Sequence, residues 1–351
     1  MTEHSSIEEL MSVPNLFKYQ CRSLGLTNPG DVIQLHPDLK KDRNYITAHY
    51  DRIGLSYTKN VVWNDDLETL RKFPDYELSV YFFGNKVNQV RPDQKWFEIA
   101  QSMNSKNDFI RVCRDLSIDI PETFCFNGRE ELKDFNDFDF PLYLKISTSS
   151  SGRGVIKCQN ANDLEDAFSL IKPGISFQIQ KEIDAKTFIN VQYAIEKGKC
   201  GRVLISEQVL DGFKHIGNRF PTPYDDAWEL TDPIAMKMRD EGMKGYFAFD
   251  LAVTNEGKYI AIECNPRVNA ATYPTIIAKR LGIKSWTVKN YKTKIRNFID
   301  LHLEDMEYDP SIGSGIIIVN WGCIDDGKLG LLIAGTIEEQ NRIENKLKQK
   351  I

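Results

Sequence analysis

The sequence predicts a mixed α/β protein built from several lobes, and three observations support this fold class. Short apolar runs alternate with helical segments over the N-terminal third of the chain. Residues 245–267, GYFAFDLAVTNEGKYIAIECNPR, place alternating apolar side chains on both sides of an Asn-Glu-Gly turn, as two neighbouring strands would. Residues 311–321 and 329–334 flank a second turn, Asp325–Lys328. The 351 residues can bury one large core or two or three smaller ones.

Composition and charge are those of an ordinary soluble enzyme. A net charge of −5 argues against a general affinity for nucleic acids. The N-terminus, MTEHSSIEEL, lacks the basic and apolar regions of a secretory signal, and the longest apolar runs are too short to cross a bilayer. Seven scattered cysteines without a C-x-x-C pair indicate reduced thiols, and no histidine spacing fits zinc. We therefore expect a cytoplasmic protein without nucleic-acid or membrane partners.

The N-terminal region, up to residue 105, predicts a small α/β domain. Apolar runs at 32–35 and 78–83 read as strands, and the segments 65–72 and 96–103 read as helices. Further along, Asn162 is the expected N-cap of a helix over 162–171, because acids fill its first turn. A helix rich in Glu and Lys, about 337–349, is expected to end this sequence.

Polar side chains on the strand pair 245–267 predict a metal site. Asn265 lies two residues past Glu263, so both side chains share one face of their strand, while Cys264 points to the other face as a packed small hydrophobe. If the strands pair, Asp250 joins them in an all-oxygen set that suits Mg²⁺ or Mn²⁺. Arg267 follows as a cation beside the metal, which suits a polyphosphate. The alternative is that these acids are solvated ends of a hairpin.

A lysine followed by a loop of small residues predicts a phosphate site. Lys145 lies on an apolar strand that breaks into Ser147–Gly154, where small side chains let backbone N–H groups approach an anion. The loop has neither the GK[ST] ending of a Walker A motif nor a G-x-G-x-x-G that opens a helix. We interpret it as a flap over phosphates, and the alternative is a flexible hairpin tip.

Together, residues 105–269 resemble the ATP-grasp superfamily. Lys106, before a helical segment, resembles the first phosphate-binding lysine of that family, and Lys145 resembles the second. The stretch DIPET at 119–123 is similar to the exit from that helix, and FQIQKEI at 177–183 is similar to the strand between lobes whose backbone reads adenine. The family usually has an acid followed by an aromatic residue in this last stretch, where this chain has Gln180 and Glu182. No residue matches the acid that binds ribose, so that contact is left open.

The resemblance implies the roles of individual residues. Nucleotide contacts are expected from Lys106, Lys145, Ser149, Ser150, Ser151, Gly152, Gly154, Gln180, Lys181 and Ile183. Asp250, Glu263 and Asn265 stand where the family places its magnesium ligands, and Arg267 stands where it often keeps an arginine near the transferred phosphate.

The resemblance also implies the ATP-grasp fold, in which the nucleotide lies between two α+β lobes that follow a small N-terminal α/β domain. The expected regions are 1–105 for the N-terminal domain, 106–183 for the small lobe, 184–308 for the large lobe and 309–351 for a C-terminal hairpin and helix. This last region resembles the C-terminal piece of pheganomycin-type peptide ligases. Its alternative reading is a module that covers a sheet edge.

Residues 206–224 are expected to set substrate identity. They carry Glu207, His215 and Arg219, and arginine suits bidentate binding of a carboxylate or phosphate. We therefore assign Arg219, with Arg267, to the reacting groups, whereas His215 reads equally as a surface histidine.

The activity that the resemblance implies is an ADP-forming carboxylate–amine ligase, which makes an amide or peptide bond through an acylphosphate. It would use ATP with Mg²⁺ or Mn²⁺ and join a small acid to an amine, with an amino acid or peptide as substrate. An ATP-grasp carboxylase or kinase-like enzyme and a non-catalytic ATP-binding regulatory protein are the alternatives. The identities of the acid and the amine, and a homodimeric state, are left open.

Overall fold

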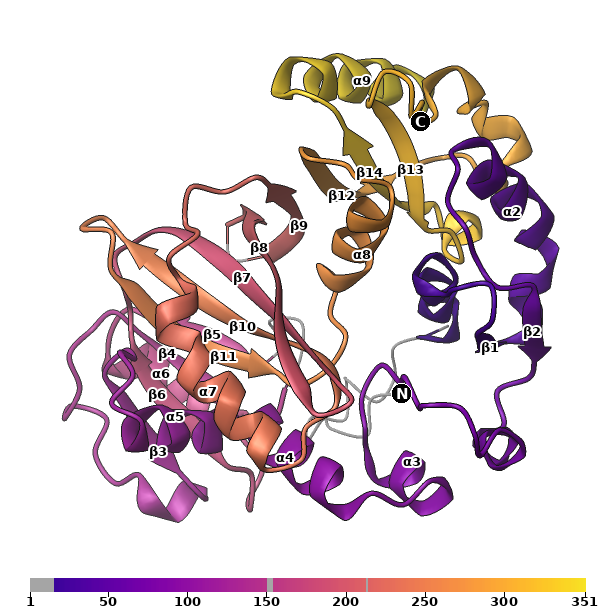
Figure 1. The fold of residues 1–351 in the computed structure, drawn as a ribbon. Coiled ribbons are helices and arrows are strands. Elements are labelled where there is room, and N and C mark those ends of the chain that lie inside the picture. Colours follow the sequence, from indigo (N-terminus) through magenta and orange to yellow (C-terminus); the bar gives the residue numbers. More distant parts are fainter. Residues whose placement is uncertain (1–15, 150–153, 213) are drawn as a thin grey trace.

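The computed structural model describes residues 16–149, 154–212 and 214–351. Three β-sheets with helices packed around them make up this part of the chain (Figure 1). The mixed α/β class that the sequence predicts is confirmed.

The smallest sheet has two parallel strands, β1 (Val32–Leu35) and β2 (Asn60–Trp63). The second sheet is antiparallel, with the order β3-β6-β4-β5, and its strands are β3 (Thr123–Phe126), β4 (Leu142–Ile146), β5 (Val155–Cys158) and β6 (Phe177–Lys181). The largest sheet is also antiparallel, with the order β11-β10-β7-β8-β9-β12-β14-β13. Its strands are β7 (Ala185–Glu196), β8 (Lys199–Asp211), β9 (Lys214–Phe220), β10 (Gly245–Thr254), β11 (Tyr259–Asn265), β12 (Trp286–Lys292), β13 (Gly315–Asn320) and β14 (Lys328–Ala334).

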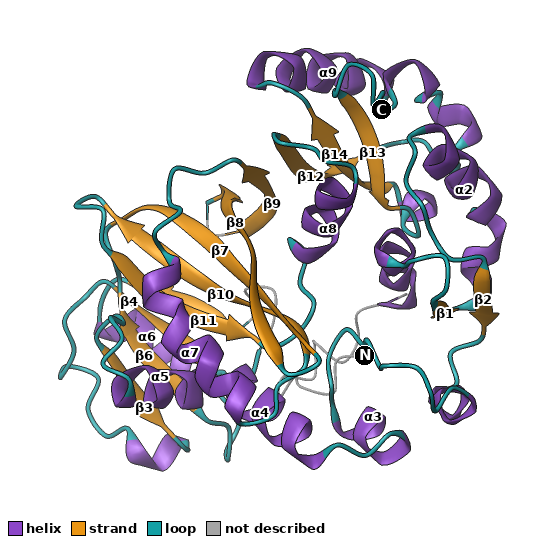
Figure 2. Cartoon of the chain, in the orientation of Figure 1, coloured by secondary structure: helices purple, strands orange, loops and turns teal. Residues whose placement is uncertain are grey.

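The helices cover both faces of the largest sheet (Figure 2). The α-helices are α2 (Arg43–Arg52), α3 (Asn85–Val90), α4 (Gln94–Asn104), α5 (Lys106–Asp115), α6 (Ala161–Ser169), α7 (Trp228–Asp240), α8 (Thr272–Arg280) and α9 (Ile337–Lys350). The 3₁₀ helices are η1 (Leu16–Leu26), η2 (Pro37–Lys41), η3 (Leu67–Lys72), η4 (Arg129–Glu131), η5 (Ile299–Leu301), η6 (Glu304–Met306) and η7 (Ile324–Asp326). Helices α4, α5 and α7 share a core with β7 and β10, whereas η1, α2, α8 and α9 share a core with β12, β13 and β14.

Most expected elements are present, and three expectations are corrected. Residues 78–83 form no strand, because Phe82 and Phe83 are buried as loop side chains and Phe83 stacks on Trp96 instead of lying in a sheet. Helix α6 begins one residue before the expected range, and its N-cap is Asn160, whose side chain accepts a hydrogen bond from the N–H of Asp163. The segment expected as a helix at 65–72 is the 3₁₀ helix η3.

The C-terminal hairpin extends the largest sheet, because β12 pairs with both β9 and β14. Strand β13 lies at the edge of that sheet, and α2 covers it. The backbone N–H of Ile318 donates to Nε2 of His49 at 3.1 Å, and the Tyr50 hydroxyl donates to the Ile318 carbonyl at 3.3 Å. Covering a strand edge prevents pairing with other chains. At this edge α2 covers the C-terminal strand β13, while β14 of the same hairpin covers the edge of β12 by pairing with it.

Glu307 connects this helix to the C-terminal half. Its carboxylate lies 2.7 Å from Nδ1 of the buried His49 and 2.6 Å from Nη2 of Arg52. Burial raises the pKa of Glu307, but the hydrogen bonds from Arg52 and His49 outweigh burial and lower the pKa from 4.5 to about 2. Because the pKa is lower in the folded state, this stabilisation is present above pH 4.5 and is lost as the pH falls towards 2.

Glu307→Gln is therefore expected to lower the free energy of unfolding near neutral pH by on the order of 2 kcal/mol, measured by urea denaturation. The variant should also lose part of the steep fall in stability below pH 4.5. Asp305→Asn is the control. The Asp305 carboxylate also forms two ion pairs, with Lys346 and Lys350, but it is half exposed, whereas Glu307 is buried. If the two variants lost equal amounts of unfolding free energy, burial of the Glu307 ion pairs would add nothing to their stabilising effect.

Candidate active site

The strand pair β10–β11 brings the three expected metal ligands together. Asp250 lies opposite Glu263, and Ala248 lies opposite Asn265, with a register shift directly after Asp250. The amide of Asn265 donates to the Asp250 carboxylate at 2.9 Å. Cys264 points to the other face and is buried in the core, as expected.

Amide side chains from two further strands hold Asp250. Asn190 on β7 donates to it at 2.6 Å, and Gln208 on β8 donates at 2.8 Å. Asn269, in the loop after β11, donates to the side-chain oxygen of Asn190 at 3.4 Å. Burial and the nearby charge of Glu263 raise the pKa of Asp250 above its ordinary value. Sequence reasoning missed Asn190 and Gln208, because no local pattern links strands that pair only in the folded sheet.

Lys106 connects the strand pair to the small sheet. It is the first residue of α5, and the N-cap of that helix, Ser105, accepts a hydrogen bond from Asp108. The Nζ atom of Lys106 lies 3.3 Å from a carboxylate oxygen of Glu263 and 3.2 Å from the carbonyl oxygen of Ser149. Burial raises the pKa of Glu263, but the charges of Lys106 and Lys145 outweigh burial, so its pKa is lowered. The half-buried carboxylate therefore stays ionised.

Lys145 lies on β4 and is buried in the small sheet. Its Nζ donates to the side-chain oxygen of Gln180, whose amide nitrogen donates in turn to the Thr123 hydroxyl at 3.0 Å. Burial lowers the pKa of Lys145 to about 8, although Glu263 acts against this shift.

Gln178 lies opposite Lys145 in the strand pair β4–β6. It is fully buried, and neither its side-chain oxygen nor its nitrogen has a hydrogen-bond partner in the described part of the chain. Buried amides normally have partners, so Gln178 is an exception among the described residues. Gln178 was missed, although the alternation of strand side chains places it on the same face as Gln180.

The low pKa of Lys145 makes nucleotide binding depend on pH. Because the cationic form binds phosphate, ATP affinity should fall as the pH rises through 8, by about tenfold per pH unit well above that value. Calorimetric titrations from about pH 7 to about pH 10 measure this, with Lys145→Arg as the control that keeps its charge. A flat profile in the unmodified protein would contradict the assignment.

Two further residues expected to contact the nucleotide, Lys181 and Ile183, lie at the end of β6 and just after it. The N–H groups of Lys181 and Glu182 are bonded to the carbonyls of Glu122 and Pro141, whereas the N–H of Ile183 makes no hydrogen bond within the described residues. The Lys181 side chain turns outward, where it pairs with Asp139 at 3.1 Å. The nucleotide contact expected of Ile183 stays a prediction.

Of the expected flap, Ser149 and Gly154 are described. The Ser149 hydroxyl accepts from Lys106 at 3.3 Å, and Gly154 has a φ of +70°, which favours glycine. The carbonyl of Gly154 accepts from the N–H of Ile146 at 2.8 Å, which closes the end of the β4–β5 pair. Ser150, Ser151 and Gly152 lie outside the described residues.

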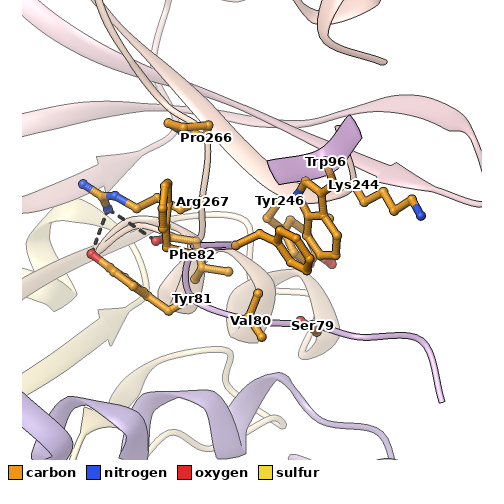
Figure 3. A pocket seen from close by; sticks show the side chains of 12 residues that line it. Ser79, Val80, Tyr81, Phe82, Trp96, Lys244, Tyr246, Pro266 and Arg267 are labelled. Carbon is orange, nitrogen blue, oxygen red and sulfur yellow. Dashed lines mark hydrogen bonds between the residues drawn. The ribbon is translucent and has the colours of Figure 1, made fainter. Parts of the chain in front are cut away.

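Arg267 lies beside a small pocket between the loop 79–83 and the start of β10 (Figure 3). Its Nη1 donates to the Tyr81 hydroxyl at 2.9 Å, and its guanidinium lies 5.2 Å from the centre of the Tyr81 ring. Aromatic side chains form much of the pocket wall, namely those of Tyr81, Phe82, Phe83, Trp96 and Tyr246. The charge of Arg267 also acts on Glu263, so the pocket lies next to the strand pair.

Arg219 occupies a different place. It pairs with Glu207 on the neighbouring strand β8, at 2.6 Å and 3.0 Å, and the Thr187 hydroxyl also donates to that carboxylate, at 2.8 Å. No contact within the described residues joins Arg219 to Lys106, Glu263 or Arg267. Most of the segment 206–224 lies in the β8–β9 strand pair. The role of Arg219 stays a prediction.

The donor set on the strand pair fits a magnesium or manganese ion. Two carboxylates and one amide oxygen from adjacent strands, Asp250, Glu263 and Asn265, supply hard oxygen donors and leave positions for phosphate oxygens and water. Among the described residues no group of three or more His, Cys, Asp or Glu side chains could hold a metal ion, and the set proposed here contains only two carboxylates.

Comparisons with known proteins give a match for structure but none for sequence. No protein-family model and no curated protein match the chain. Three similar solved structures are N5-carboxyaminoimidazole synthetase from Staphylococcus aureus with ADP, biotin carboxylase from Campylobacter jejuni with an ATP analogue, and an L-amino acid ligase from Bacillus licheniformis.

These similarities extend over nearly the whole chain. The synthetase has a TM-score of 0.61 at 13% identity, covering 93% of this chain and 99% of its own. The carboxylase has 0.62 at 14%, covering 95% and 88%, and the ligase has 0.56 at 11%, covering 92% and 98%. No helix among the described residues is long and apolar enough to span a membrane. The similarity to these three structures shows that the chain has the ATP-grasp fold that its motifs predict.

Proposed function

We propose that this protein is an ATP-dependent, ADP-forming carboxylate–amine ligase. The observation on which this rests is the meeting of Lys106, Lys145 and Glu263 between the small and large sheets, with Asp250 and Asn265 beside them. Two cations next to an oxygen donor set suit a polyphosphate with its divalent cation. The similar structures with bound ADP or an ATP analogue support the same ligand.

The residues of this chain support a reaction in two steps. Lys106 and Lys145 hold the phosphates, and a carboxylate oxygen of the acid attacks the γ-phosphorus, so that ADP leaves and an acylphosphate forms. An amine then attacks the acyl carbon, loses a proton and displaces phosphate. Magnesium, held by Asp250, Glu263 and Asn265, would supply charge neutralisation. No side-chain nucleophile is needed, because positioning and electrostatics suffice for phosphoryl transfer.

Carboxylation is the second candidate. Two of the three structures described above are a carboxyaminoimidazole synthetase and a biotin carboxylase. In such a reaction bicarbonate would take the place of the acid. Dependence of ADP release on bicarbonate would favour this candidate, and dependence on an organic acid would favour the ligase.

The test is a screen of amino-acid pairs for ATP- and Mg²⁺-dependent release of phosphate, with products identified by mass spectrometry. Hydroxylamine in a parallel screen traps an acylphosphate as a hydroxamate without knowledge of the natural amine. We expect ADP release that needs an acid, and a hydroxamate of that acid. ATP binding without turnover on any acid, amine or bicarbonate would instead indicate a regulatory ATP-binding protein.

A further inference from the structure

Lys145 is held by a neutral amide rather than by a carboxylate. Its Nζ donates to the side-chain oxygen of Gln180, and no carboxylate among the described residues forms an ion pair with it. Lys106, the other lysine of the candidate site, lies 3.3 Å from a carboxylate oxygen of Glu263. An ammonium group has three N–H donors, and the bond to Gln180 uses one of them. Lys145 is therefore fixed in direction by a partner that does not neutralise its charge.

Thr123 in turn fixes the orientation of the Gln180 amide. The Gln180 nitrogen donates to the Thr123 hydroxyl at 3.0 Å, and this hydroxyl donates to the Pro121 carbonyl at 2.8 Å. The two ends of the series determine the direction of every bond, because an ammonium can only donate and a carbonyl can only accept. The Gln180 oxygen must therefore face Lys145, and the Thr123 hydroxyl must accept from the Gln180 nitrogen.

The three side chains lie on one face of the small sheet. Thr123 on β3 lies opposite Gln180 on β6. On its other side, Gln180 lies opposite Tyr143 on β4, two residues before Lys145. Opposite residues of paired strands, and residues two apart on one strand, point to the same face. Thr123 is 4% exposed, Gln180 2% and Lys145 9%, so water has little access to replace a lost bond.

We propose that Thr123 and Gln180 are positioning residues that aim Lys145 at the phosphates of the nucleotide. This inference rests on the proposed function, which supplies the phosphate role of Lys145. Thr123 orients the amide of Gln180, and Gln180 directs the ammonium group through a bond that leaves its positive charge available to an anion. Neither residue has to touch the nucleotide for this effect. A direct contact between Gln180 and the nucleotide stays a prediction.

The test is a double-mutant cycle of Thr123 and Lys145 on the full chain. Calorimetry with ATP and Mg²⁺ at about pH 7, where Lys145 is protonated, measures the affinity. Thr123→Val keeps nearly the same shape but removes the hydroxyl, so ATP binding should weaken by about fivefold or more. Thr123→Ser keeps the hydroxyl and should retain most of the affinity. Added to Lys145→Met, Thr123→Val should change the affinity by less than about twofold, because the group that it positions is gone.

Thr231→Val is the matched control for a general loss of stability. Thr231 is fully buried on α7, and its hydroxyl lies 2.7 Å from that of Tyr193. The same chemical change at this position should lower the melting temperature but leave the affinity for ATP unchanged. A loss of affinity that came only from a weakened sheet would be the same with and without Lys145, whereas positioning requires Lys145 to be present.

Gln180→Leu replaces Thr123→Val if that variant unfolds. It removes the amide itself, and the same cycle with Lys145→Met should give about a fivefold or larger loss of ATP affinity with Lys145 and less than about twofold without it. Unchanged affinity in a folded Thr123→Val or Gln180→Leu protein, or equal losses with and without Lys145, would overturn the inference. If Lys145→Met by itself left ATP binding unchanged, the phosphate role in the proposed function would fail first, and the positioning role with it.

Discussion

Replacing Glu263 with alanine is expected to abolish Mg²⁺-dependent ADP formation while the fold is kept. Glu263 is the carboxylate that lies opposite Asp250 and 3.3 Å from the Nζ of Lys106. Its loss removes a cation ligand and leaves two lysines without their shared counter-charge, so kcat should fall by about a thousandfold or more. Steady-state ADP release with saturating acid and amine measures the loss.

Glu256→Ala is the matched control for this variant. Glu256 lies in the turn of the same strand pair. Its carboxylate is 75% exposed and pairs with Lys258 at 3.1 Å. We expect its activity to equal that of the unmodified protein. Circular dichroism and the melting temperature of both variants establish that the sheet is intact. Normal turnover by a folded Glu263→Ala protein would show that the metal assignment is wrong.

Replacing Lys145 with methionine is expected to weaken ATP binding by about ten- to a hundredfold without unfolding the protein. The side chain is buried on β4, and methionine keeps most of its volume. Removing a buried cation relieves the cost of its desolvation, whereas the side-chain oxygen of Gln180 loses its donor. These two effects oppose each other, so we expect the stability of the ATP-free protein to change by less than about 2 kcal/mol.

Calorimetry for ATP and urea denaturation without ATP test the two halves of this expectation. Lys157→Met is the matched control, because Lys157 lies on the neighbouring strand β5 but bonds to Glu182. Its effect on ATP affinity should be the smaller. Unchanged ATP affinity in Lys145→Met would reject the phosphate role of Lys145.

Short motifs of this chain were sufficient to predict the strand pair of the site. The alternation around Asp250 and Glu263 is a local property, because side chains of a strand point to opposite faces in turn. The position of Lys106 at the start of a helix, and of Lys145 on a short apolar strand, could likewise be predicted from neighbouring residues. The ATP-grasp fold followed from the order of these motifs along the chain.

Local patterns failed where long-range packing decides. Residues 78–83 have the apolar composition of a strand, but Phe83 stacks on Trp96 at 4.1 Å and the segment forms a loop beside Arg267. The pairing of the Arg219 guanidinium with Glu207 across β8 and β9 was likewise not visible in the sequence, while the role of Arg219 as a substrate ligand stays a prediction. Neither partner can be identified from neighbours in the sequence.

The sequence by itself therefore predicted which residues could hold a nucleotide and a cation, because those residues lie in short motifs with regular spacing. The support around them came only from tertiary structure. Asn190 and Gln208 both donate hydrogen bonds to Asp250. Asn190 lies on β7, which pairs with β10 only in the folded sheet, and Gln208 lies on β8, one strand further along. Arg22 on η1 contacts Tyr273 on α8, far away in the sequence, because hydrophobic packing of η1 against α8 brings the two side chains together.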